Sequence, residues 1–330
     1  MTVLVITHSR DHDGVAGVLD HVRARGHEVI RLDTDRYPLD AALTIEQGAH
    51  TDRAWLTLDG ATHDLTTVDA IWYRRLRAPR LPPDMPHDLR GVAADEARRV
   101  LLGLLNAHPA FALDPWINVR HADHKQRQLA AAAALGLTVP PTLTTNDPAA
   151  VRAFAARHPQ GIVTKMLSTF ALDREGEQHV VFTRALTPDD LDALDSLRLC
   201  PMVFQARIDR VRELRCTIVG HNVYCAALDA EASKATADDW RRDTRGLAAA
   251  WRPHALPREL EIRLLALASR LGLNYGAADL LVDHDGTHHF LEINPAGEWG
   301  WVERAGLPIG EAIAAVLTDP KARRVPGGIA

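Results

Sequence analysis

The first third of the chain alternates between short apolar runs and an amphipathic stretch. VLVITH at residues 3–8 is followed by helical periodicity over 14–25 and then by HEVIRLDT at 27–34. Two apolar runs joined by a helix are typical of parallel strands with a crossover connection. The runs LTIE, AWLTLD and AIWYRR add strands, and a helix is predicted from about Asp88 to Asn106. The pattern predicts an α/β N-terminal domain over residues 1–113.

The rest of the chain mixes helices and strands in the manner of an α+β fold. A helical run ends at Gly136, a natural C-terminal glycine, and another helix follows Pro148. Helices are also expected over 257–271 and 308–317. Strands are expected at GIVTKML and over residues 203–208, 214–220 and 222–229. We place a boundary at residue 200, which gives two further units, 114–200 and 201–330.

Residues 276–297, GAADLLVDHDGTHHFLEINPAG, have the pattern of a β-hairpin. Asp285-Gly286 between apolar runs is the signature of a two-residue type I′ turn. With those residues as the loop, Asp279 lies opposite Glu292. Asn294 then shares their face, because side chains alternate along a strand.

Two carboxylates on neighbouring strands repel each other unless a positive group lies between them. Oxygen ligands from carboxylates and amides suit Mg²⁺, which usually also takes phosphate oxygens. Asp279, Glu292 and Asn294 therefore form a candidate metal–phosphate site. The alternative is ordinary structure, in which Asp279 ends a strand and Asn294-Pro295 begins a turn.

Composition narrows the function classes. The 330 residues carry a net charge of −5, which argues against broad nucleic-acid binding. We expect no signal peptide and no membrane span, hence a cytoplasmic protein. The 17 histidines contain no HExxH pair, so no zinc site is expected. Three cysteines lack metal-ligand spacing and are expected to be free thiols in apolar segments.

Four charged residues elsewhere are candidates for chemistry. Lys165 lies inside the apolar run IVTKML, where a lysine must face a partner or ligand unless it extends from the strand edge to water. Lys125 opens a helix, and Glu213 and Arg215 share one strand face. Taken singly, Lys125 is most often a solvated residue, and Glu213 with Arg215 is usually a surface pair of little consequence.

In their order along the chain, these residues resemble the ATP-grasp fold, in which two α+β subdomains hold ATP between them. The resemblance narrows to the microviridin-type peptide maturases, or graspetide synthetases, and spans the chain from Val3 to about Leu317. LEINPAGEWGW carries most of its specificity. The other matching segments are THSRDHDG, LDTDRYP, IWYRR, HKQRQLAAAAALGL, TKMLSTF, CPMVFQARI, ELRCTIVG, DDWRR and LGLNYGAADL.

The resemblance implies a role for each candidate. Lys125 and Lys165 would neutralise the α- and β-phosphates of ATP. Arg215 would lie near the transferred phosphate, and with Lys165 it would be catalytic. The adenine hinge would be Gln205 to Ile208, including Ala206, with Glu213 toward the ribose. Mg²⁺ would be held by Asp279, Glu292 and Asn294.

Two segments depart from the family pattern or have no assigned role. Ala206 stands where relatives of this fold often have an acidic residue, so adenine recognition would depend more on the backbone. The run Asp239-Trp240-Arg241-Arg242 resembles a family motif, but its role does not follow from residue type and spacing. By itself it is equally consistent with a helix end or a solvated loop. The loop at Ser168-Thr169 is a candidate lid.

The activity implied by the resemblance is ATP-dependent cyclisation of a ribosomally made precursor peptide. The enzyme would phosphorylate Asp or Glu side chains and form esters or amides with Thr, Ser or Lys. The precursor would bind through a leader segment, and the enzyme would be a homodimer. Two alternatives stay open: a ligase that joins a free amino acid or small acid to an amine, and an inactive nucleotide-dependent peptide-binding protein.

Overall fold

The computed structural model describes residues 1–11, 14–165, 171–174, 177–180, 183–231 and 248–324. The predicted N-terminal α/β domain is confirmed by a parallel four-stranded sheet with helix α1 (Val15–Ala24) as the first crossover. Its strands, in sheet order, are β2 (Glu28–Asp33), β1 (Thr2–Thr7), β6 (Ala70–Tyr73) and β7 (Phe111–Leu113).

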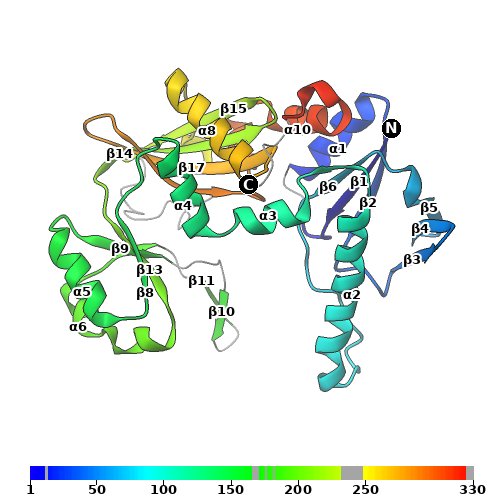
Figure 1. Ribbon diagram of the computed structural model, residues 1–330, viewed down its shortest axis with the longest axis horizontal. Coiled ribbons are helices and arrows are strands. Elements are labelled where there is room, and N and C mark those ends of the chain that lie inside the picture. Colours follow the sequence, from blue (N-terminus) through cyan, green and yellow to red (C-terminus); the bar gives the residue numbers. More distant parts are fainter. Residues whose placement is uncertain (12–13, 166–170, 175–176, 181–182, 232–247, 325–330) are drawn as a thin grey trace.

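A second, antiparallel sheet and a long helix complete this domain (Figure 1). The sheet consists of β3 (Ala41–Gly48), β4 (Thr51–Leu58) and β5 (Ala61–Asp64), followed by the 3₁₀ turn η1 (Leu65–Thr67). Helix α2 (His87–Ala107) follows the proline-rich connection, close to the predicted bounds. Leu101 and Leu104 of α2 belong to the apolar core that also contains Leu4 and Leu56.

Helices α3 (Trp116–Ala122) and α4 (Lys125–Ala134) lead from the N-terminal sheet to the rest of the chain (Figure 1). The helix α4 ends as predicted, because Gly136 has a φ of 75°, a left-handed conformation that glycine adopts without steric cost. Helix α5 (Pro148–Arg157) begins at an Asp147 side chain that accepts a hydrogen bond from the Ala149 N–H.

The central unit is built on a four-stranded sheet, in which β13 lies between β8 and β9. Because β13 extends to Ala206, the central sheet continues past the predicted boundary at residue 200. The strands, in sheet order, are β12 (Arg184–Ala185), β9 (Ile162–Lys165), β13 (Met202–Ala206) and β8 (Thr142–Thr145). A two-stranded sheet and two short helical segments accompany it: β10 (Ala171–Arg174), β11 (Glu177–Val180), α6 (Pro188–Asp192) and η2 (Leu194–Leu199).

The C-terminal unit is a five-stranded antiparallel sheet covered on one face by α8 (Arg258–Arg270). Leu264 and Leu267 of α8 pack with Leu214 and Ile293 from the sheet. The strands, in sheet order, are β16 (Arg252–Pro253), β15 (Asn222–Asp229), β14 (Arg210–Val219), β17 (Tyr275–Asp283) and β18 (His288–Asn294). Shorter elements are η5 (Ala248–Ala250), α9 (Gly300–Arg304), α10 (Ile309–Thr318) and η6 (Pro320–Ala322).

The N-terminal and C-terminal units share one apolar core. Val3 and Trp72 from the N-terminal sheet are buried with Val219, Tyr275 and Trp299 from the C-terminal unit. Helix α10 packs against α1 within the same core, and the two lie side by side in Figure 1. On the sheet face opposite α8, Val219 and Tyr275 belong to this core, and Arg215 and Asp279 lie further along the same two strands.

The predicted hairpin forms, but its turn differs from the prediction. The Asp283 N–H donates to the Thr287 carbonyl, so the loop has three residues, and of these only Gly286 has a positive φ (79°). This geometry corresponds to a type I turn followed by a left-handed glycine. Leu280 pairs with Phe290 and Asp279 pairs with Glu292, so Leu291 is left over as a β-bulge. This extra residue compensates for the longer loop. Asp279 therefore lies opposite Glu292 as predicted, although the two-residue type I′ turn is wrong.

The three cysteines are free thiols, as expected. Cys216 and Cys225 are buried opposite each other on β14 and β15. Cys200, however, is exposed, so its expected location in an apolar segment is wrong.

Candidate active site

Three strands of the C-terminal sheet bring a row of charged side chains together. Arg215 on β14 pairs with Asp279 on β17, which in turn pairs with Glu292 on β18. The Arg215 guanidinium donates to Asp279 Oδ1 at 2.6 Å. At the other end of the row, Lys125 Nζ lies 3.1 Å from Glu292 Oε2. Residues separated by up to 167 positions thus form one row, with two carboxylates in the middle and a positive side chain at each end.

Arg215 is held rigidly in this row. The residue is only 6% exposed, it donates to the Glu298 carbonyl at 3.1 Å, and its guanidinium lies 5.1 Å from the Trp301 ring centre. Burial lowers the pKa of Arg215, but the adjacent Asp279 carboxylate outweighs burial and the net pKa is raised. Its Nε has no hydrogen-bond partner among the described residues. A buried, permanently charged guanidinium with an unused donor is suited to bind an anion.

Gln128 is a site residue that the sequence analysis did not identify. Its side chain is fully buried and makes a reciprocal pair of hydrogen bonds with the backbone of Ile293, which lies between Glu292 and Asn294. The Gln128 amide also donates to the Ala122 carbonyl at 2.6 Å. The available signal was a polar residue on the helix face that also carries Ala131 and Ala132.

The loop after Asn294 is anchored by side chains from distant elements. The Asn294 Oδ1 accepts the Ala296 N–H at 2.9 Å. Asn294-Pro295 therefore begins a turn, as the alternative interpretation of this segment predicted. Arg74 donates to the Ala296 carbonyl at 2.6 Å, and the Tyr275 hydroxyl donates to the Gly297 carbonyl at 2.7 Å. These contacts hold Asn294 at the end of β18 on the face of Glu292.

The donor set fits a hard cation that is completed by phosphate oxygens. Among the described residues, no group of three or more His, Cys, Asp or Glu side chains is arranged to hold a metal. Asp279, Glu292 and Asn294 offer two carboxylates and an amide oxygen on one face. Mg²⁺ is bound in this way, with one or two carboxylates and the substrate's own phosphates. Arg215 and Lys125 presently neutralise the two carboxylates and are themselves suited to phosphate.

Lys165 and the predicted adenine hinge lie on a different sheet, the central one. Lys165 is the last residue of β9, and its neighbour β13 carries Gln205 and Ala206. The Gln205 side chain donates to Thr142 Oγ1 at 2.8 Å. The Ala206 N–H donates to the Pro141 carbonyl. Ile208 lies past the end of β13, so the predicted hinge strand is shorter than expected.

Past the end of β13, one backbone N–H of the predicted hinge has no backbone partner among the described residues. The Arg207 N–H donates to the Gly161 carbonyl, whereas the Ile208 N–H has no backbone partner within the described part of the chain. Glu213, on the same sheet face as Arg215, accepts from Arg210, with 2.7 Å between Arg210 Nη2 and Glu213 Oε1. Its predicted contact with a ribose stays a prediction.

Two predicted features lie outside the described residues. These are the Ser168-Thr169 lid and the run Asp239–Arg242. None of the helices that the structure describes combines the length with the apolar character that a membrane span requires.

The fold and the site define an ATP-grasp ligase. The family model described as the MvdD pre-ATP grasp domain matches residues 2–120. The macrocyclase MdnC from Microcystis aeruginosa, solved with its precursor peptide MdnA, is 40% identical with a TM-score of 0.89, and the match covers 97% of this chain and 100% of MdnC. This chain therefore belongs to the ATP-grasp maturases of ribosomal peptides.

Two further solved structures support this assignment. An ATP-grasp ligase associated with ribosomal peptides from Chryseobacterium gregarium, solved with ADP and a leader and core peptide, is 33% identical with a TM-score of 0.93 and covers 98% of this chain and 99% of its own. The macrocyclase MdnB from Microcystis aeruginosa is 33% identical with a TM-score of 0.81 and covers 96% of this chain and 99% of its own. No curated protein matches the chain significantly.

Proposed function

We propose that this protein uses ATP to cyclise a ribosomally made precursor peptide. An Asp or Glu side chain of the peptide takes the γ-phosphoryl group of ATP, which releases ADP. A Thr or Ser hydroxyl or a Lys amine of the same peptide then attacks the acyl carbon and expels inorganic phosphate. The observation that carries this proposal is the charged row from Arg215 through Asp279 and Glu292 to Lys125.

The first step needs charge neutralised around the phosphates. When bound, ATP supplies the phosphoryl group and Mg²⁺ disperses the charge that develops on it. Asp279, Glu292 and Asn294 would hold the metal, and Lys125 and Lys165 would bind phosphate oxygens. Because Lys125 contacts Glu292 of the C-terminal sheet and Lys165 ends strand β9 of the central sheet, the two lysines would approach the nucleotide from two different sheets.

The nucleotide base would lie along the central sheet. The predicted hinge, Gln205 to Ile208, would meet adenine with its backbone, and Glu213 would face the ribose. Within it the Ile208 N–H is the available donor, because the N–H groups of the two preceding residues are already bonded within the protein. Ala206 has no polar side chain to add to this recognition.

Arg215 would serve both steps. In the first it stabilises the moving phosphoryl group, and in the second it stabilises the oxyanion and the departing phosphate. Its burial supports this role, because a charge in a site of low dielectric acts more strongly and needs no reorganisation. Water must be kept away from the acyl phosphate, since water attack would return the free acid.

The organisation of the protein carries further expectations. We propose that residues 1–113 form the pre-ATP-grasp domain and that the two ATP-grasp subdomains follow, with the central sheet extending to Ala206. The peptide would bind through a leader segment. A homodimer and a cytoplasmic location stay predictions.

A mass-spectrometric assay tests the proposed function. The protein is incubated with ATP, Mg²⁺ and the MdnA precursor peptide, or a short Thr- and Asp/Glu-rich peptide encoded beside its gene. Loss of the mass of one water per ring, dependent on ATP, is the expected result. ADP release with a free amino acid or amine, and no change in any peptide, would favour the free-substrate ligase. Nucleotide binding without turnover would favour the inactive peptide-binding protein.

A further inference from the structure

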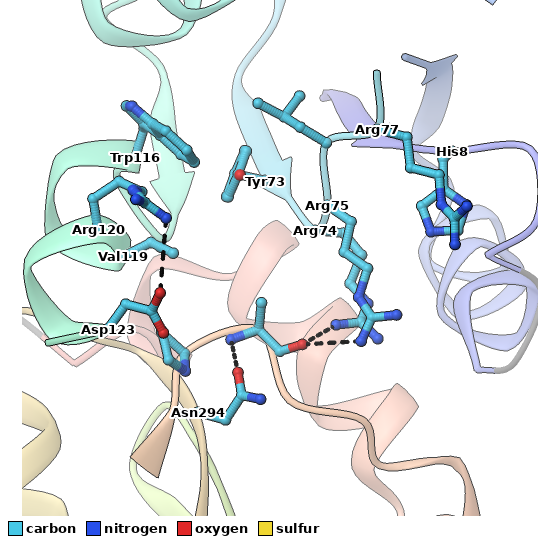
Figure 2. A pocket seen from close by; sticks show the side chains of 13 residues that line it. His8, Tyr73, Arg74, Arg75, Arg77, Trp116, Val119, Arg120, Asp123 and Asn294 are labelled. Atoms are coloured by element: carbon cyan, nitrogen blue, oxygen red, sulfur yellow. Dashed lines mark hydrogen bonds and ion pairs between the residues drawn. The ribbon is translucent and has the colours of Figure 1, made fainter. Parts of the chain in front are cut away.

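A cavity of about 300 Å³ is lined on one side by the N-terminal domain and on another by the loop that begins at Asn294. Figure 2 shows its walls: the segment after β6 carries Arg77, helix α3 carries Trp116 and Arg120, and the loop at Asn294 closes a third side. Since Asn294 is a predicted metal ligand, a group bound in this cavity lies next to the phosphate-transfer site.

Two of the four arginines in the cavity wall are already paired with carboxylates. Arg74 and Arg75 each approach Glu298 to 2.6 Å, and Arg74 also lies 3.6 Å from Asp11. These two arginines connect the N-terminal sheet to the loop after Asn294. Their guanidinium groups are therefore already engaged by groups of the protein itself.

Two arginines of the wall are available. Arg77 is exposed and has no carboxylate within ion-pair distance among the described residues. Arg120 lies 3.7 Å from Asp123, but both side chains are more than half exposed, so this pair is weak. His8 adds no charge near neutral pH, because burial lowers its pKa and Arg77 and Arg75 lower it further against the opposing effect of Asp11.

The cavity also has an aromatic wall. Tyr73 and Trp116 meet edge to face with ring centres 4.8 Å apart, and the Arg120 guanidinium lies 5.4 Å from the Trp116 ring centre. Aromatic surface packs against peptide backbone and aliphatic carbon, while the guanidinium fork of an arginine binds a carboxylate through two parallel hydrogen bonds. The combination matches a peptide segment with acidic side chains.

We infer that this cavity binds an acidic side chain of the precursor's core, the part that is modified, with Arg77 and Arg120 as specificity-determining residues. The inference rests on the proposed function and identifies where the acid is held next to the phosphate site. Arg77 and Arg120 lie on two different walls of the cavity, so a carboxylate bound within it is attracted by positive charge from both walls. A neutral amide of the same shape loses this attraction.

A binding assay tests the inference apart from catalysis. Fluorescein-labelled MdnA and a copy with its core Asp and Glu residues replaced by Asn and Gln are titrated with the full chain, ADP and Mg²⁺. The wild-type protein is expected to bind the amide copy about tenfold more weakly, the scale of a lost charge-assisted contact. The double variant R77Q/R120Q should bind both peptides with nearly the same weak affinity.

Arg53 provides the matched control, because it is an exposed arginine on β4 in the outer sheet of the N-terminal domain. The R53Q variant should discriminate between the peptides as the wild type does. Equal discrimination by R77Q/R120Q and wild type would overturn the inference, and so would a wild type that binds the two peptides alike. Cyclisation of MdnA by that wild type would leave the proposed function standing while the inference fails.

Discussion

Gln128 and Ile293 are joined by two hydrogen bonds in opposite directions. The Gln128 side-chain N–H donates to the Ile293 carbonyl at 2.7 Å, and the Ile293 N–H donates to the Gln128 side-chain oxygen at 3.0 Å. One buried amide thereby couples helix α4, which carries Lys125, to strand β18, which carries Glu292 and Asn294. Helix and strand keep their spacing because the amide satisfies both backbone groups of Ile293 at once.

Replacing Gln128 with leucine is expected to destabilise the protein and to displace Glu292 and Asn294, the predicted metal ligands on β18. The change leaves the Ile293 N–H and the Ile293 and Ala122 carbonyls buried without partners, each at a cost of about 1 kcal/mol or more. We expect the free energy of unfolding to fall by about 3 kcal/mol and the KM for ATP to rise. Urea unfolding and ADP-release kinetics measure the two effects.

Gln126 offers the control for this prediction, since it is exposed on the other side of the same helix. Gln126→Leu should change stability by less than about 0.5 kcal/mol. Equal losses from the two substitutions would contradict the positioning role of Gln128.

Glu292→Gln is expected to abolish ATP turnover while the fold is retained. The substitution keeps the size of the side chain but removes the charge of a predicted metal ligand and the ion pair with Lys125. A loss of about 100-fold or more in ADP release is expected, on the scale of removing one electrostatic contact in an active site. Asp285→Asn, at the exposed tip of the same hairpin, is the control. Unchanged turnover in Glu292→Gln would remove the predicted triad from the mechanism.

Asp114 is expected to make stability depend on pH. Its carboxylate accepts the N–H groups of Asn274 and Tyr275 at 2.7 and 2.9 Å, and burial raises its pKa to about 7. A carboxyl whose pKa is higher in the folded state takes up a proton on folding, so its contribution is largest at low pH and is lost as pH rises through 7. Between pH 5 and 8 the loss is about 2 to 3 kcal/mol.

The Asp114→Asn variant isolates this effect, because an amide does not titrate. Its free energy of unfolding should vary less between pH 5 and 8 than that of the wild type, although the variant is less stable at pH 5. Urea unfolding at the two pH values makes the comparison. Parallel pH profiles for the two proteins would show that Asp114 does not titrate in this range.

Gly14→Ala is expected to disturb the contact between the N-terminal and C-terminal units. A methyl group at Gly14 would lie 2.8 Å from the Trp299 ring, and Gly14 has a φ of 80°. Gly26 has the same φ with open space around it. Gly26→Ala should therefore cost about 1 kcal/mol from backbone strain alone. Gly14→Ala should cost at least about 2 kcal/mol more by thermal unfolding, and equal costs would contradict the steric explanation.

Much of the fold followed from the sequence alone. Apolar spacing predicted the parallel N-terminal strands, the bounds of β15 and the ends of α4 and α8, because these elements depend on local periodicity and on terminal residues such as Gly136. The pairing of Asp279 with Glu292 was also predicted. It was correct because two unpredicted features, a three-residue loop and the bulge at Leu291, cancel in the register.

Tertiary structure alone decided how the site is completed. The sequence determined which residue types are available: oxygen ligands on one hairpin, two lysines and a strand arginine. It did not determine that Arg215 is buried against Asp279, that Gln128 holds β18, or that Arg77 and Arg120 line the same cavity. These contacts join segments far apart in the chain. No local pattern encodes them, because they depend on how the sheets and helices pack together.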